Sequence, residues 1–123
     1  MIGALLVAVL LTAGGCGKSS SGDAAVPKTP QQAASQLEQV FAPAQVEIKD
    51  KAVAASQALR TSDYEKAAQA LALLETRNDL TLEQGLAVHN SSIALIGKLV
   101  VAMEAGDPNA KRAYELLKAA RAK

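Results

Sequence analysis

The chain has 123 residues, of which 50% are hydrophobic, 20% are charged and 2% are aromatic, and its formal net charge is +1 at pH 7. This length predicts a single small domain, and the interspersed acidic and basic residues argue against nucleic-acid binding, which needs a basic surface. About a fifth of the residues are alanine, a strong helix former, and no segment alternates as a strand would. The composition therefore predicts an all-α protein with a thin, closely packed core.

The first fifteen residues form an uncharged apolar stretch that ends in small residues directly before Cys16, the only cysteine. The stretch is too short to span a bilayer as a helix, but it has the length of a signal-peptide apolar region. The run Ala13-Gly14-Gly15-Cys16 resembles the cleavage and lipidation site of bacterial lipoproteins. The resemblance implies that residues 1–15 are removed and that Cys16 is acylated as the new amino terminus. The alternative is that residues 1–15 belong to the fold and that Cys16 is a free thiol.

Residues 16–29 comprise the predicted lipidated cysteine and a stretch rich in Gly, Ser and Pro, a composition typical of a flexible linker. Enterobacterial lipoproteins that stay in the inner membrane usually carry an aspartate after the cysteine. Because Gly17 occupies that position here, the resemblance favours the outer membrane over the inner membrane. Gly17-Lys18-Ser19 ends like a phosphate-binding loop, but Thr12 stands where that loop needs a glycine, so nucleotide binding is rejected.

Helical capping patterns predict where the domain of residues 30–123 begins. Thr29 and Pro30 read as an N-cap followed by proline at the first helical position, which predicts a helix over residues 30–41. Proline inside a helix removes a hydrogen bond and clashes with the preceding turn. We therefore expect Pro43 to break this helix and a second helix to occupy residues 43–60.

Two further capping boxes are expected. Ser62 with Glu65 predicts a third helix from about residue 63, and Thr81 with Gln84 predicts a long fourth helix over residues 82–105. The apolar face expected for the third helix consists of Tyr64, Ala67, Ala68, Leu71 and Leu74.

The long fourth helix carries an apolar seam at heptad spacing and a second apolar face formed by Leu95, Leu99 and Ala102. A helix that is apolar on both sides should lie centrally among its neighbours, so we expect it to be the spine of the bundle. Its apolar run over residues 93–103 is far below the about 20 residues needed to span a membrane. The seam consists of Leu82, Leu86, His89, Ile93, Ile96, Val100 and Met103.

A glycine and a proline, in the run Gly106-Asp107-Pro108, predict the end of the fourth helix and the start of the last one. The last helix should bury Ala110, Ala113, Tyr114, Leu117 and Ala120. It also carries a basic cluster, for which we expect a solvated face or, alternatively, a contact with anionic lipid head groups or peptidoglycan carboxylates. The cluster consists of Lys111, Arg112, Lys118, Arg121 and Lys123.

His89 is the only histidine, and no second histidine or carboxylate stands at a spacing that would complete a metal site or a catalytic pair. We expect a packed or partly exposed structural histidine. Gly85 and Gly97 weaken the long helix, and we expect each to mark the close approach of a neighbouring helix.

The run Asp63-Tyr64-Glu65-Lys66-Ala67, followed by further leucines, resembles the middle of a tetratricopeptide repeat, and the turn at residues 106–110 echoes it. The resemblance implies antiparallel helical hairpins packed side by side. Together these patterns predict a small bundle of four to five helices in such hairpins.

The sequence offers no nucleophile paired with a base and no set of metal ligands, so neither an enzyme nor a cofactor is expected. We expect a lipoprotein, anchored to the membrane through Cys16, whose helical domain is a non-catalytic protein-interaction or structural module of the cell envelope. An envelope protein is the expected partner. The alternative is an envelope spacer that self-associates through the seam of the long helix.

Overall fold

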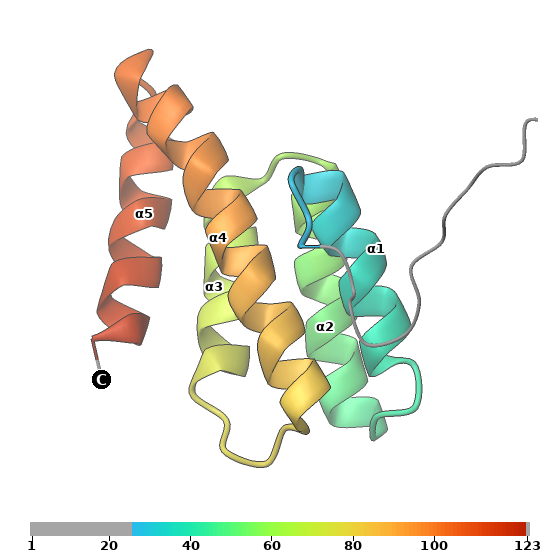
Figure 1. Cartoon of the computed structure of the whole chain (residues 1–123). Coiled ribbons are helices and arrows are strands. Elements are labelled where there is room, and N and C mark those ends of the chain that lie inside the picture. Colours follow the sequence, from blue (N-terminus) through green and yellow to red (C-terminus); the bar gives the residue numbers. More distant parts are fainter. Residues whose placement is uncertain (1–25, 123) are drawn as a thin grey trace, which may run out of the picture.

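The computed structural model describes residues 26–122, and within them the chain forms five α-helices and no strand. Figure 1 shows successive helices running antiparallel, which confirms the all-α bundle of helical hairpins. The first four helices close a ring in which each packs against the next and the fourth returns to the first. The fifth helix lies outside this ring, against the third and fourth. The helices are α1 (Pro30–Phe41), α2 (Val46–Arg60), α3 (Tyr64–Glu75), α4 (Leu82–Glu104) and α5 (Pro108–Arg121).

The core combines a few large side chains with many small ones. Alanine supplies more than half of the buried apolar residues, which allows the helix backbones to approach closely. The predicted inner faces of α3 and α5 are confirmed, with Tyr64, Tyr114 and Ala120 only half-buried. The largest fully buried apolar side chains are Phe41, Leu37, Leu59, Leu71, Leu74, Leu95, Leu99, Leu117 and Val88.

The start of α1 is confirmed, and that of α2 is corrected. The Thr29 side chain accepts a hydrogen bond from the Gln32 amide at 3.1 Å, and Pro30 is the first helical residue. α2 begins at Val46 rather than at residue 43, because residues 42–45 are needed to reverse the chain between two antiparallel helices. In this turn the Ala44 amide donates to the carbonyl oxygen of Phe41 at 3.0 Å.

The predicted capping box of Ser62 and Glu65 is wrong. Ser62 has a φ of 59°, a left-handed conformation that terminates α2, while the Asp63 amide donates to the carbonyl of Ala58 at 2.9 Å. The next residue takes over the capping role, since the Asp63 side chain accepts from the Lys66 amide at 3.3 Å.

The end of α4 repeats this joint. Gly106 has a φ of 91°, and the Asp107 amide donates to the carbonyl of Ala102 at 3.0 Å. Asp107 then caps α5 by accepting from the Asn109 amide at 2.9 Å. The hairpins α2–α3 and α4–α5 therefore share one terminating geometry, which accounts for the echo between their sequences.

The capping box of α4 is confirmed, but the predicted burial of its seam is wrong. Thr81 accepts from the Gln84 amide at 3.1 Å, and Gln84 accepts in return from the Thr81 amide at 3.0 Å. Most of the seam faces outward, with Leu82 80% exposed and Leu86 51% exposed, whereas Ile96 and Met103 are half-buried against the core. The opposite face is buried because its alanines and serines let three helices, α1, α3 and α5, pack closely on it. α4 thus packs against three helices, but so does α3, against α2, α4 and α5, and the prediction that α4 is the spine of the bundle is not confirmed.

The expectation of close helix approach at the glycines of α4 is also wrong. A Cβ atom placed on Gly85 or on Gly97 would meet no atom within 4 Å in the described part of the chain. The helix therefore contains two weak helix formers that its own packing does not require.

Candidate interaction surface

Cys16, the one site residue predicted from the sequence, lies outside the described residues. Its acylation therefore stays a prediction.

The outward face of α4 carries an apolar surface that no other described helix covers. Ile93 is 44% exposed and Val101 is 64% exposed, besides the two leucines of the first turns. The three charged residues of α4 leave the middle of this surface free, because Glu83 and Glu104 lie at the two ends and Lys98 lies to one side. We call this surface the α4 stripe and define it as Leu82, Leu86, His89, Ile93, Val100 and Val101.

Of the described helices, α4 alone is long and apolar enough to cross a membrane by length and composition. The apolar run of residues 93–103 is too short to cross a membrane, whereas the whole helix of 23 residues is long enough. Of its most apolar stretch of 18 residues, 33% is buried within the bundle. The core helix of a soluble protein can have the same length and composition.

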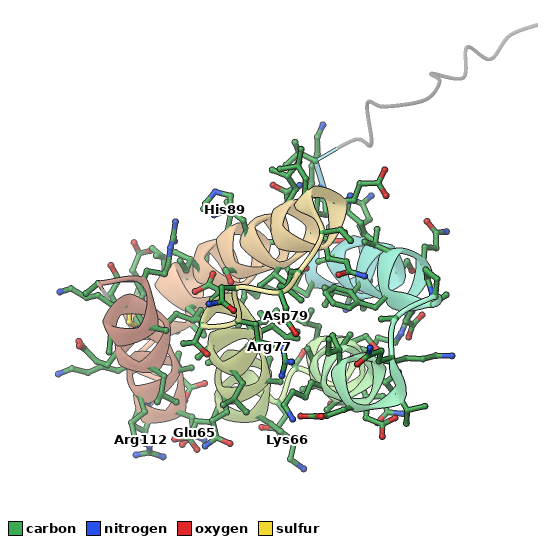
Figure 2. The ribbon with its side chains drawn as sticks, turned by 90° about the horizontal axis from the view of Figure 1, so that it is seen from below. Glu65, Lys66, Arg77, Asp79, His89 and Arg112 are labelled. Carbon is green, nitrogen blue, oxygen red and sulfur yellow. The ribbon has the colours of Figure 1, made fainter. Side chains whose placement is uncertain are left out.

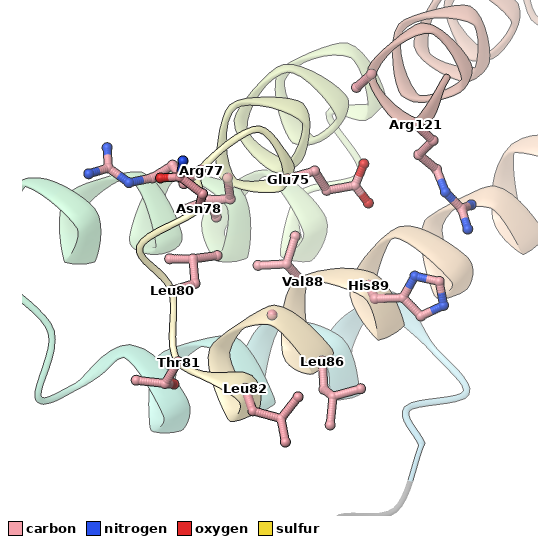
Figure 3. A pocket seen from close by; sticks show the side chains of 13 residues that line it. Glu75, Arg77, Asn78, Leu80, Thr81, Leu82, Leu86, Val88, His89 and Arg121 are labelled. Atoms are coloured by element: carbon pink, nitrogen blue, oxygen red, sulfur yellow. The ribbon is translucent and has the colours of Figure 1, made fainter. Parts of the chain in front are cut away.

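Beside the stripe, a series of hollows runs along the contact between α4 and α5. The largest, about 580 Å³, lies between the end of α3, the first half of α4 and the end of α5, and Figure 3 shows it from close by. A second, of about 280 Å³, is lined by Ile96 of α4 and by Tyr114, Lys118 and Arg121 of α5. A third, of about 440 Å³, brings Lys111 next to Met103. Arg121 therefore shares a hollow with three residues of the α4 stripe, Leu82, Leu86 and His89. Lys118 and Lys111 line hollows with Ile96 and Met103, which lie beside the stripe on α4.

The basic cluster predicted for the last helix is divided between two sides of the molecule. Arg112 donates from Nε to Glu65 Oε1 at 2.7 Å and so joins α5 to α3. Figure 2 shows Arg112 and Glu65 on the side of the bundle opposite His89. The cations beside the stripe are Lys111, Lys118 and Arg121, and Lys123 lies outside the described residues.

A carboxylate from α3 lines the largest hollow. Ser92, which is fully buried, donates from Oγ to Glu75 Oε1 at 2.8 Å. The second carboxylate oxygen, Oε2, is buried and has no hydrogen-bond partner in the described structure. In Figure 3 the side chains of Glu75, Arg121 and His89 extend toward the same space.

The Ser92 hydroxyl donates directly to the Glu75 carboxylate, and this hydrogen bond joins α4 to α3. His89 is exposed on the outer side of α4. Among residues 26–122 no group of three or more His, Cys, Asp or Glu side chains is placed to hold a metal ion. The hollow therefore combines apolar contact surface with charged side chains.

Two ion pairs stabilise the helix connections. Arg60 pairs with Glu38 at 2.5 Å and, together with a hydrogen bond from buried Ser56, lowers the pKa of that carboxyl below its ordinary value. At the rim of the largest hollow Arg77 holds Asp79 through two hydrogen bonds of 2.7 and 2.8 Å, which lowers the pKa of Asp79. Both pairs fix the positions of helices or loops, and neither faces the α4 stripe.

Comparisons with known proteins found no matching family model, no similar curated protein and no similar solved structure. The resemblance of residues 63–74 to a tetratricopeptide hairpin therefore stays a prediction. The seam of α4 and the basic cluster of α5 were both predicted from the sequence, but the hollows between these two helices were not. The spacings of seven residues from Lys111 to Lys118 and of three from Lys118 to Arg121 were the signal that they share one side of α5.

Proposed function

We propose that this protein is a membrane-anchored bacterial lipoprotein whose helical domain is a non-catalytic interaction or structural module of the cell envelope. The observation that carries the proposal is the exposed α4 stripe, since the main apolar patch on the surface of a folded protein is often a functional surface. The face is presented by a capped and well-packed bundle, so its exposure does not come from a poorly folded element.

The anchor in this proposal is Cys16. Its support is the lipoprotein-like run that ends at this residue, and the linker composition up to Thr29, where the first helix is capped. Gly17 after the cysteine favours the outer membrane as the destination. A lipid anchor would hold the stripe at the membrane surface, where envelope components are available to cover it.

The polar groups around the largest hollow support a non-catalytic role. Ser92 is engaged by Glu75, and Arg77 is engaged by Asp79. These groups connect helices and loops, which is a structural task.

A second candidate, a spacer that self-associates, is favoured by the spacing of the stripe. Leu86, Ile93 and Val100 recur every seven residues and point outward, as in the seam of a coiled coil. Sedimentation of the full chain in detergent tests this candidate. A dimer that becomes a monomer in Leu86→Glu would support the spacer, and a monomer at all concentrations would exclude it.

The test of the main proposal has two parts. The intact mass of the protein from the membrane fraction should equal residues 16–123 plus acyl chains, and Cys16→Ala should lose the acyl mass and leave the membrane. In the acylated protein the variant Ile93→Cys should then react far more slowly with a membrane-impermeant maleimide in native envelopes than in detergent. Val46→Cys is the matched control, because Val46 is 72% exposed on α2. Equal reactivity of the two thiols in envelopes would contradict an interaction through the stripe.

A further inference from the structure

We propose that the α4 stripe and the adjacent side of α5 form a face that lies on an anionic phospholipid bilayer. The inference rests on the proposed anchor at Cys16 and names the component that covers the stripe. It follows from the chemistry of the face, its charges, its size and the place where the chain enters the domain.

The chemistry of the face suits the boundary between head groups and acyl chains. The exposed side chains of the stripe are aliphatic apart from His89, and from Leu86 to Val101 the one charged residue of α4, Lys98, lies to one side. A helix that lies in a membrane interface buries an aliphatic face of this kind to a shallow depth, with polar and cationic groups beside it. α4 therefore has the apolar half of such a helix.

The cationic half comes from α5. Lys118 and Arg121 share a hollow with Ile96, and Tyr114 lines it as well. Long cationic side chains beside an apolar surface can place their charges at the level of lipid phosphates, and tyrosine is common at that level. Glu75 lines the same hollow as Arg121, but its Oε2 atom is buried and its Oε1 atom accepts from Ser92. The other carboxylates of the face lie apart from this pair of cations, with Glu83 and Glu104 at the two ends of the stripe and Glu115 near Lys111.

The size of the stripe favours a bilayer over a second copy. From Leu82 to Val101 an α-helix rises about 28 Å, and a helix face about 10 Å wide gives a footprint of roughly 300 Å². A stable protein–protein interface buries roughly 800 Å² per partner, more than this face provides. A bilayer already bound through an anchor needs no such area, because the anchor keeps the local concentration of lipid high.

The chain also enters the domain on the correct side. Figure 2 shows residues 26–29 leaving the bundle on the side of α4 toward which His89 points. Ten residue steps separate Cys16 from Val26, and a chain of that length spans at most about 35 Å. An acylated Cys16 would therefore keep this side of the domain close to the bilayer.

The experiment measures the depth of spin labels in the acylated full chain, reconstituted into vesicles of phosphatidylethanolamine with phosphatidylglycerol. Because the lipid occupies the Cys16 thiol, nitroxides can be attached singly at Leu86→Cys, Ile93→Cys or the control Val46→Cys. Labels on the stripe should collide several-fold less often with a water-soluble nickel complex, and more often with oxygen, than the label on α2. Equal collision rates at all three positions would overturn the proposal.

Charge provides a second arm. The variant Lys118→Glu should raise the nickel collision rate at position 93 in vesicles that contain phosphatidylglycerol. Lys66→Glu is the matched control, since Figure 2 shows Lys66 on the side of the bundle opposite His89. An equal effect of both charge changes would contradict a contact between α5 and anionic lipid.

Three outcomes distinguish a failure of the bilayer contact from a failure of the anchor. The spectrum of the label at position 93 would broaden through dipolar coupling as the protein density rises if the stripe contacts a second copy. Such broadening, with oxygen collisions equal to those of the label on α2, would overturn bilayer docking. A protein whose intact mass lacks acyl chains would overturn the anchor itself, and with it this inference. Acylated protein with stripe labels in water would overturn the docking and leave the proposed anchor in place.

Discussion

Ser62 and Gly106 occupy equivalent positions in two helical hairpins, with φ angles of 59° and 91°. In each case the following aspartate, Asp63 or Asp107, donates its amide to the carbonyl five residues earlier and caps the next helix with its side chain. The same joint is thus built once with glycine, which adopts this conformation without strain, and once with serine, which does not.

We expect Ser62→Gly to stabilise the protein by about 0.5 to 1 kcal/mol, because glycine removes the steric cost of the left-handed conformation. Gly106→Ala should destabilise it by about 1 kcal/mol for the converse reason, although the added Cβ would meet no atom within 4 Å. Urea unfolding of the full chain, followed by far-ultraviolet circular dichroism, measures both changes. A loss of stability in Ser62→Gly would show that the serine side chain contributes more than its backbone strain costs.

Gly97→Ala separates helix propensity from packing on α4. The residue is exposed, and a Cβ atom there would meet nothing within 4 Å. Alanine should therefore raise the free energy of unfolding by about 1 kcal/mol. The same urea titration checks this value, and a destabilised variant would contradict an open position.

Much of the fold could be predicted from local chemistry. Thr29 and Thr81 cap the helices where their sequence patterns placed them, because this capping depends only on residues three apart in the chain. Ser62 fails for the same local reason. Two adjacent residues, Ser62 and Asp63, can both cap, and the one that must end α2 in a left-handed conformation is not available to begin α3.

The orientation of α4 could not be predicted in this way. Both of its faces are apolar, so periodicity alone does not identify the inner one. The face with Ala87, Ser91 and Ser92 is buried, since small side chains allow neighbouring helices to approach. The larger seam residues, which carry the stronger hydrophobic pattern, remain outside and form the candidate surface.

Ser92→Ala tests the buried contact between α4 and α3. The hydroxyl donates to Glu75 Oε1 at 2.8 Å, and Glu75 Oε2 has no hydrogen-bond partner in the described structure. Loss of the donor should therefore destabilise the protein by about 1 to 3 kcal/mol. In a chain that already carries Glu75→Gln, Ser92→Ala should cost less, because no carboxylate is then left without a donor. Thermal unfolding of the native chain, the two single variants and the double variant measures this coupling. Equal costs in both backgrounds would contradict a direct contribution of the hydrogen bond.

Leu71→Ala measures how well the alanine-rich core can adjust. Leu71 is fully buried on α3, which contacts α2, α4 and α5. Removing its side chain should destabilise the protein by about 2 to 5 kcal/mol. Leu73→Ala is the matched control on the same helix, since Leu73 is 55% exposed and should change stability by less than about 0.5 kcal/mol. Urea unfolding compares the two, and similar losses would contradict the assigned inner face of α3.

Glu38 should make stability depend on pH. Arg60 and buried Ser56 favour its ionised form and lower its pKa from the ordinary value of 4.5, so its contribution is present above that pH and is lost as the pH falls through the folded-state pKa. The side chains of the pair are 39% and 41% exposed, and solvent screening limits the expected contribution to about 1 kcal/mol or less. Urea unfolding should show the native chain more stable than Glu38→Gln at pH 7, with the difference shrinking toward pH 3. The control Asp50→Asn removes an exposed carboxylate on α2 instead, and its stability difference from the native chain should not shrink in this way. A parallel response of both variants would indicate a general effect of net charge.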